Sequence, residues 1–294
     1  MARMTRHVGV GSARWAAACV LVAGCASAGG MSEAVRRANC AWHVCLSQED
    51  TPTGRVYRVD NDEPVPVTVG LSFRSLENLE PPPADTVRVV VEPNASASVR
   101  LPAIRRGRPV LADVAISIDL GSSATEPDAD VVYGVPFGGG ARRPLIQGYG
   151  GEGTHLGSMR YSLDFGMPRG TPVLAARDGV VLYLQDGFTE GGNDPSLLER
   201  ANLVVIAHSD GTMASYGHLS RGLEVAVGDT VREGQLLGLS GRTGFAGQPH
   251  LHFHVGLRML GEPGRTIPIR MRARDGEELE LVEGAQIPPA RRTF

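Results

Sequence analysis

The sequence predicts a mainly β protein, with a small N-terminal β-sandwich-like domain followed by a larger C-terminal all-β domain. The 294 residues include 38 glycines and 20 prolines but only 5% aromatic residues, a composition that favours short strands and frequent turns over long helices. Apolar and polar residues alternate in many short runs, which is the pattern of half-buried strands. The length is sufficient for two modest domains, each with its own core.

Residues 1–24 are predicted to be a signal peptide. Arg3, Arg6 and Arg14 accompany an apolar run over residues 15–24, which is shorter than the ~20 residues that span a bilayer. The stretch Leu21-Val-Ala-Gly-Cys25 resembles a lipobox, in which Cys25 would be lipidated and become the mature N-terminus. Ala26-Ser-Ala28 offers ordinary signal cleavage as the alternative. We favour lipidation because it gives this cysteine a role.

The next segments are expected to be a tether over residues 25–50 and an accessory sandwich-like domain over residues 51–120. Cys40 and Cys45 lie close together in the tether, and an oxidising compartment favours a small-loop disulfide between them. Residues 65–73, 86–91 and 110–119 alternate as strands do. No catalytic constellation occurs there, so we expect this domain to position the protein or to bind a partner such as a protein regulator. Residues 121–130 are rich in Gly, Ser, Asp and Pro and are expected to be a linker.

Charge and composition exclude several classes of function. The formal net charge is −3, and no basic run is interleaved with aromatic residues, so nucleic acid is not an expected partner. The sequence contains no lysine. Chemistry that needs a lysine amine is therefore excluded.

The most informative segment of the C-terminal domain, residues 131–294, is Pro249-His-Leu-His-Phe-His-Val255. Its alternation predicts a strand in which His250 and His252 share a face, about 7 Å apart. Two imidazoles on one strand face are typical of a metal site. The alternative is one buried, hydrogen-bonded histidine beside one in solvent.

Further motifs surround this strand in a fixed order. They are Gln147-Gly-Tyr-Gly150, His155, Tyr161-Ser-Leu-Asp-Phe-Gly166, Gly170-Thr-Pro-Val173, Ala207-His-Ser-Asp-Gly211, Tyr216-Gly-His-Leu-Ser220, Val227-Gly-Asp-Thr-Val-Arg-Glu-Gly-Gln235 and Gly241-Arg-Thr-Gly244. With them, residues 145–257 resemble the LytM/lysostaphin-type zinc peptidases (peptidase family M23), which cut peptide bonds in peptidoglycan. The resemblance implies that family's fold, the duplicated hybrid motif, for the C-terminal domain.

The resemblance also implies the site residues. The zinc ligands would be His155, Asp164 and His252, which leave a fourth tetrahedral position open, as in catalytic zinc sites. His218 and His250 match the family's two non-ligand histidines and suit general-base and transition-state roles. The family usually places three residues between its first two ligands, whereas eight separate His155 from Asp164 here.

Two other histidines are interpreted as supporting residues. His254 shares the strand face of His250 and His252, and we interpret it as a histidine at the edge of the site rather than as a fourth ligand. His208 is interpreted as a structural histidine or one that supports the ligands.

The expected function is a zinc-dependent endopeptidase acting on stem or crosslink peptides of peptidoglycan, at D-alanyl–diaminopimelate crosslinks. We expect it in the cell envelope as a periplasm-facing lipoprotein, held to the outer membrane by its lipid because Ala26 rather than Asp follows Cys25. The alternative is a non-catalytic relative that binds and activates another wall hydrolase, and the filled ligand and histidine positions argue against it. Residues 225–241 are expected to form two hairpin arms around Arg232-Glu-Gly234, similar to biotinyl or lipoyl carriers, but such carriers need a lysine.

Overall fold

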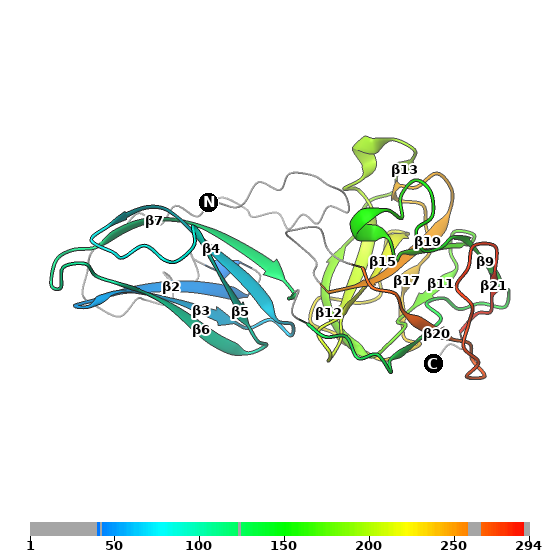
Figure 1. Cartoon of the computed structure of the whole chain (residues 1–294). Coiled ribbons are helices and arrows are strands. Elements are labelled where there is room, and N and C mark those ends of the chain that lie inside the picture. Colours follow the sequence, from blue (N-terminus) through cyan, green and yellow to red (C-terminus); the bar gives the residue numbers. More distant parts are fainter. Residues whose placement is uncertain (1–39, 42, 123–124, 258–265, 291–294) are drawn as a thin grey trace. The chain divides into compact units, whose positions relative to one another are not determined.

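Strands dominate both parts of the protein (Figure 1). The computed structural model describes residues 40–41, 43–122, 125–257 and 266–290, and the chain divides into two compact units between Ser122 and Ser123. The prediction of a mainly β protein is confirmed. Within the described ranges, no helix has the length and apolar character needed to cross a bilayer. The predicted signal peptide and Cys25 lie outside the described residues.

The N-terminal unit consists of two antiparallel sheets, ordered β1-β2-β3-β6 and β5-β4-β7. The strands are β1 (Cys40–Ala41), β2 (Val44–Thr51), β3 (Gly54–Asn61), β4 (Val67–Glu77), β5 (Thr86–Val91), β6 (Ala95–Pro102) and β7 (Leu111–Leu120). Tyr57 from β3 meets Phe73 from β4 edge to face, with ring centroids 5.6 Å apart. Both sheets bury apolar side chains, among them Leu46, Val59 and Leu71, as a sandwich requires.

The first two strands of this unit begin before residue 51, where the sequence analysis placed the start of the accessory domain. Cys40 and Cys45 lie directly opposite each other in the β1–β2 register and form a disulfide. Val44 and Leu46 are buried, whereas Glu49 and Asp50 are exposed. A short apolar stretch with a polar end does not stand out from a tether by sequence, and its burial depends on the sheet that forms later in the chain.

The C-terminal unit is built on an eight-stranded sheet with the order β16-β12-β14-β15-β19-β10-β9-β21. Its strands are β9 (Arg143–Gln147), β10 (Leu163–Gly166), β12 (Gly179–Gln185), β14 (Asn202–Ala207), β15 (Met213–Leu219), β16 (Thr230–Val231), β19 (His250–Gly256) and β21 (Gln286–Ile287). Three two-stranded pairs complete it: β11 (Pro172–Leu174) with β17 (Leu236–Leu239), β13 (Gly191–Gly192) with β18 (Gly244–Phe245), and β20 (Arg270–Arg272) with β8 (Val132–Gly134).

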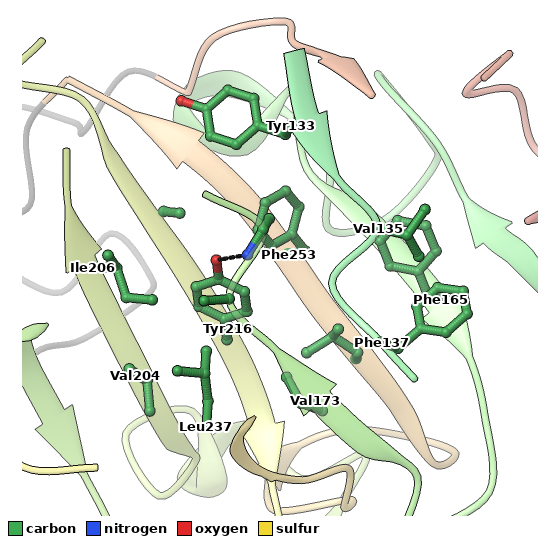
Figure 2. Packing of buried hydrophobic residues seen from close by; sticks show 14 of the residues in the cluster. Tyr133, Val135, Phe137, Phe165, Val173, Val204, Ile206, Tyr216, Leu237 and Phe253 are labelled. Carbon is green, nitrogen blue, oxygen red and sulfur yellow. Dashed lines mark hydrogen bonds between the residues drawn. The ribbon is translucent and has the colours of Figure 1, made fainter. Parts of the chain in front are cut away.

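The core of this unit lies between the large sheet and the β11–β17 pair (Figure 2). Tyr216, Phe253, Phe165 and Phe137 are fully buried in it. The Tyr216 hydroxyl accepts a hydrogen bond from the backbone N–H of Ala176 at 2.9 Å, drawn as the dashed line in Figure 2. Burying a phenol without a partner would be costly, and this bond removes that cost.

The expected hairpin over residues 225–241 does not form. Its two strands join different sheets: β16 pairs with β12, and β17 pairs with β11. Val231 on β16 and Leu237 on β17 are both fully buried. Burial of each strand against a distant partner therefore outweighs the local pairing that the intervening turn would favour.

Candidate metal centre and active site

Two neighbouring strands place acidic and imidazole side chains on one face of the large sheet. Asp164 on β10 lies directly opposite His252 on β19 in the antiparallel register. The next residue along each strand, Phe165 on β10 and Phe253 on β19, is fully buried on the core side, where Figure 2 shows its ring. The two-residue period of a strand thus divides β10 and β19 into an apolar face and a chemical face.

His155 reaches the same place from a loop. The loop between β9 and β10 includes the short 3-10 helix η1 (Gly157–Met159) and accommodates the long spacing before Asp164. Nδ1 of His155 lies 2.8 Å from the backbone oxygen of Gly148. A carbonyl can only accept, so Nδ1 carries the proton and Nε2 presents its lone pair. The His155 side chain is fully buried.

The three predicted ligands form a compact donor set. Nε2 of His155 and Nδ1 of His252 lie 3.3 Å and 2.8 Å from Oδ1 of Asp164. One ligand atom from each residue lies within 4.8 Å of the others. Among the described residues, these three form the group of His, Cys, Asp or Glu side chains that is close enough to hold a metal ion. Two atoms bound ~2.1 Å from a tetrahedral ion lie about 3.4 Å apart, so the spacing fits a metal.

A buried atom supports this fit independently of the distances. Nε2 of His155 is enclosed and has no hydrogen-bond partner among the described residues, because its contact with Asp164 lacks the geometry of a hydrogen bond. An enclosed lone pair without a partner is destabilising unless something binds it. Two imidazole nitrogens and one carboxylate are the donor types of catalytic zinc sites, and they leave one position open.

The electrostatics of the cluster favour the ionised form of the Asp164 side chain. Burial alone would raise the pKa of Asp164, but the neighbouring His252, His155 and His250 hold it well below its usual range. Burial opposes the charged form of His155, yet its contact with Asp164 raises the pKa of this imidazole. Asp164 therefore offers an ionised oxygen at any pH near neutrality, as a metal ligand must.

His218 and His250 face each other beside the donor set, with ring centroids 4.5 Å apart. Nδ1 of His218 lies 2.7 Å from the backbone oxygen of Thr243, and Nδ1 of His250 lies 2.9 Å from that of Gln248. Each Nδ1 is therefore the donor, which leaves the lone pair on Nε2. Nε2 of His250 lies 3.8 Å from Oδ2 of Asp164.

Both histidines are kept neutral. Burial and the nearby His250 and His252 lower the pKa of His218 to about 3. Burial also lowers the pKa of His250. A neutral imidazole with a free Nε2 can accept a proton, which is the first requirement for a general base.

A local distortion aims His218 at the site. The β14–β15 register shifts between Asn202 and Val204, and His218 has φ 62°, in the left-handed region. An irregularity of this kind re-aims a side chain out of the regular alternation. Left-handed backbone is strained for a non-glycine residue, and the Thr243 hydrogen bond helps to hold it.

The other two histidines of the domain lie in different settings. Nδ1 of His254 is 3.2 Å from Nε2 of His252, so His254 lies on the side of the His252 ring that faces away from Asp164. Burial and His252 lower the pKa of His254 to about 3. His208 follows β14, where it lies 2.8 Å from the backbone oxygen of Asp178 and packs edge-on against Tyr133. His208 is thus bound to structural neighbours.

A groove of about 920 Å³ opens over the chemical face. One wall comes from residues 153–159, and the other from the segments around η2 (Pro195–Leu197) and β18. Apart from Asp164 and the histidines, the described lining side chains are uncharged, and they include Thr154, Ser158, Asn193 and Gln248. The groove provides hydrogen-bonding groups for a peptide backbone.

The two walls were not predicted from the sequence, although glycines signal one of them. A Cβ on Gly191 would meet the backbone oxygen of Arg242 at 1.5 Å, and a Cβ on Gly244 would meet Ala201 at 2.7 Å. Because both glycines lack a Cβ, the segment around β13 can pack closely against β18. The carbonyls that bind His155, His218 and His250 were also not predicted, since any residue type can supply them.

The comparisons with known proteins identify one peptidase family. Residues 158–263 match the model described as "Peptidase family M23". The C-terminal unit carries a peptidase family M23 domain. The match starts three residues after His155, and the resemblance seen in the motifs is confirmed.

Two curated relatives each match about a third of the chain or somewhat more. "Cell division protein DipM" of Caulobacter vibrioides is 35% identical over 114 residues, 39% of this chain and 17% of the relative. "Peptidoglycan DD-endopeptidase ShyA" of Vibrio cholerae is 42% identical over 95 residues, 32% of this chain and 20% of the relative. The first curated relatives are thus matched over a quarter of their length or less.

One solved structure is similar in sequence over about half of the chain. The "catalytic domain of the antimicrobial peptidase lysostaphin" from Staphylococcus simulans is 30% identical, with 48% of this chain and 95% of that chain covered and a TM-score of 0.29.

Proposed function

We propose that this protein is a zinc-dependent endopeptidase that hydrolyses peptide bonds in peptidoglycan, at D-alanyl–diaminopimelate crosslinks, in the bacterial cell envelope. The observation that carries the proposal is the donor set His155, Asp164 and His252, beside two histidines with free Nε2 atoms. Asp164 and His252 of this set line a groove. A closed structural site would use a fourth protein ligand, whereas the donor group in the described part of the chain has three.

The three donors would hold the zinc. When bound, zinc supplies a Lewis acid that polarises a carbonyl and lowers the pKa of water towards ~7. The chain's own part is to keep the donors ready. Nδ1 of His155 is held by Gly148, which aims Nε2 at Asp164, and burial of His155 and Asp164 excludes competing water.

His218 and His250 would move protons. Each is held through Nδ1 by a carbonyl, and each is kept neutral by burial, so Nε2 can take a proton from the attacking water. The resulting imidazolium can return the proton to the leaving amine. Their Nδ1–H bonds prevent either ring from turning its protonated edge towards the substrate.

The choice of bond rests on two supports. A relative with 42% identity is named a peptidoglycan DD-endopeptidase, and a lipobox ending at Cys25 fits an envelope with an outer membrane. Relatives named for glycyl-glycine cleavage act on a different bond. The groove side chains are compatible with a peptide of either kind.

The test is cleavage of defined muropeptides by the purified mature protein, read by mass spectrometry. A crosslinked D-alanyl–diaminopimelate dimer should be cut to monomers, a pentaglycine-bridged dimer should remain intact, and a chelator should stop the reaction. Cleavage of the glycine bridge alone would replace the proposed bond. If the preparation cuts no muropeptide but stimulates a separate wall hydrolase, the proposed enzymatic function is wrong and the protein is a regulator.

The envelope location has its own test. Cys25→Ser should abolish palmitate labelling and move the protein from the membrane to the soluble fraction, because acyl-chain burial supplies much of the membrane affinity of a lipoprotein. Recovery of the unaltered protein wholly in the soluble fraction would contradict lipidation and favour cleavage at Ala26-Ser-Ala28.

A further inference from the structure

Most histidines of the site share one device that fixes the position of their proton. In each case Nδ1 bonds to a backbone oxygen 2.7–2.9 Å away, and a carbonyl can only accept. The pairs are His155 with Gly148, His218 with Thr243, and His250 with Gln248. The proton is therefore on Nδ1, and Nε2 is the nitrogen that acts.

His252 is the exception. Its ring is reversed relative to the others, with Nδ1 2.8 Å from Oδ1 of Asp164 and Nε2 pointing away from the donor set. To bind a metal through Nδ1, this ring must carry its proton on Nε2. The group that meets Nε2 is a side chain, because Nδ1 of His254 lies 3.2 Å away.

The proton of the neutral His252 ring could instead lie on Nδ1. If it sat on Nδ1, it would be donated to Asp164, and one hydrogen bond would occupy two of the three metal donors at once. An acceptor at Nε2 favours the other tautomer, because a half-buried N–H without a partner is destabilising. His254 would supply that acceptor with Nδ1 when its own proton is on Nε2.

We propose that His254 is a positioning residue for the metal site: it accepts a hydrogen bond from Nε2 of His252 and so leaves Nδ1 of His252 free for the metal. This rests on the proposed zinc site. His254 is not needed as a ligand, because the donor group in the described chain consists of His155, Asp164 and His252. Its Nδ1 faces the opposite edge of the His252 ring from the donor atom.

The strand explains why position 254 can do this. His252 and His254 are two residues apart on β19 and project from the same face, and their ring centroids lie 5.3 Å apart. Across the sheet, Ser215 on β15 lies opposite His254 in the register and is buried.

The test uses two variants of nearly equal size. In His254→Asn, Oδ1 takes the place of Nδ1 and can accept the same hydrogen bond. In His254→Leu, a methyl group stands there instead. Zinc affinity is measured by competition with a chromogenic chelator, with thermal unfolding of the zinc-free proteins as a control for folding. The proton position on His252 is measured by ¹⁵N NMR of its ring in the zinc-loaded proteins.

The leucine variant should bind zinc ~10–100-fold more weakly, the usual effect of losing such a partner, and the asparagine variant should bind it like the unaltered protein. At saturating zinc both should regain turnover, since His218 and His250 remain. Equal affinity of all three proteins would overturn the proposal. Equal weakening in both variants would also overturn it, because it would show a role that only histidine can fill, such as direct ligation.

Failure of the underlying zinc site looks different. If the unaltered protein and His252→Ala both bind no zinc, the proposed function falls and the role of His254 falls with it. If the unaltered protein binds zinc, His252→Ala does not, and His254→Leu binds as well as the unaltered protein, then only the role of His254 is wrong.

Discussion

Strands β6 and β19 alternate in the same way but differ in what their polar faces can do. On β6, in the N-terminal sandwich, Ser96, Ser98 and Arg100 point to solvent. Ser96 simply binds Asp60 and Arg58 at the surface. On β19 the polar positions hold His250, His252 and His254, which are largely enclosed. The ring of His252 contacts that of His254, and the ring of His250 contacts that of His218.

The difference lies in the surrounding loops rather than in the strands. The loop that carries His155 and the segments around η2 and β18 enclose the face of β19. Enclosure excludes water, strengthens the interactions among charges and lone pairs, and lowers the pKa values of His218 and His254. A polar strand face thus becomes a chemical site only where loops cover it.

The largest effect is expected when a donor is removed from the enclosed face. His252→Ala should lose both zinc and muropeptide cleavage, because two donors bind zinc much more weakly than three. The loss of zinc affinity should exceed the ~100-fold loss that follows removal of a supporting hydrogen bond. Zinc content by mass spectrometry of metals and turnover by muropeptide analysis measure this. The control is Arg58→Ala on the open face of the sandwich, which should change neither. Full zinc content in His252→Ala would break the comparison.

The next effect separates chemistry from metal retention within the same face. His218→Ala and His250→Ala should each keep zinc near the normal content and lower turnover by ~10²-fold or more, the usual scale for a lost acid–base group. The same two assays measure it. Loss of zinc in His250→Ala with full zinc content in His252→Ala would show that His250 is the ligand and His252 the proton-transfer residue. Wild-type turnover in both His218→Ala and His250→Ala would refute the mechanism.

Burial of a histidine also lowers the stability of the folded protein at acidic pH. His208, which lies away from the metal donors, illustrates this effect. Burial lowers the pKa of His208 from 6.5 to about 4. The unfolded chain then takes up this proton more readily than the folded one, so stability is full above pH 6.5 and falls as the pH drops towards 4.

His208→Asn keeps a donor for the Asp178 oxygen but cannot titrate. Between pH 7.5 and pH 4 it should lose ~3 kcal/mol less of its unfolding free energy than the unaltered protein, since one pKa unit is worth about 1.4 kcal/mol. Urea unfolding at the two pH values measures this. An equal loss in both proteins would show that His208 is already accessible to protons in the folded state.

The smallest effect concerns the wall that encloses the groove. Gly191→Ala places a methyl group against the Arg242 backbone oxygen, which cannot move aside cheaply, so the β13–β18 contact should open at a cost of ~1–3 kcal/mol. The Michaelis constant should rise more than turnover falls. Gly192→Ala is the matched control, because its Cβ would make only an ordinary contact with Leu197, at 3.8 Å. Similar kinetics and thermal stability in the two variants would show that the wall tolerates displacement.

Much of the fold and site could be predicted because it depends on short-range pattern. Alternation identified the β19 strand and placed His250 and His252 on one face, and the ordered motifs pointed to His155 and Asp164. The hairpin over residues 225–241 was predicted wrongly because a turn between two apolar runs looks the same whether the runs pair with each other or with distant strands.

The amino-acid sequence by itself determined which side chains are available for chemistry: two imidazoles and a carboxylate as donors, further histidines, and no lysine. Only the tertiary structure decided how they act. Asp164 meets His252 through a register across β10 and β19, and His155 arrives over a loop. The carbonyls of Gly148, Thr243 and Gln248 set the proton on three rings. Backbone oxygens are the same in every residue, so no pattern of side chains reveals which of them a fold will bring to an imidazole.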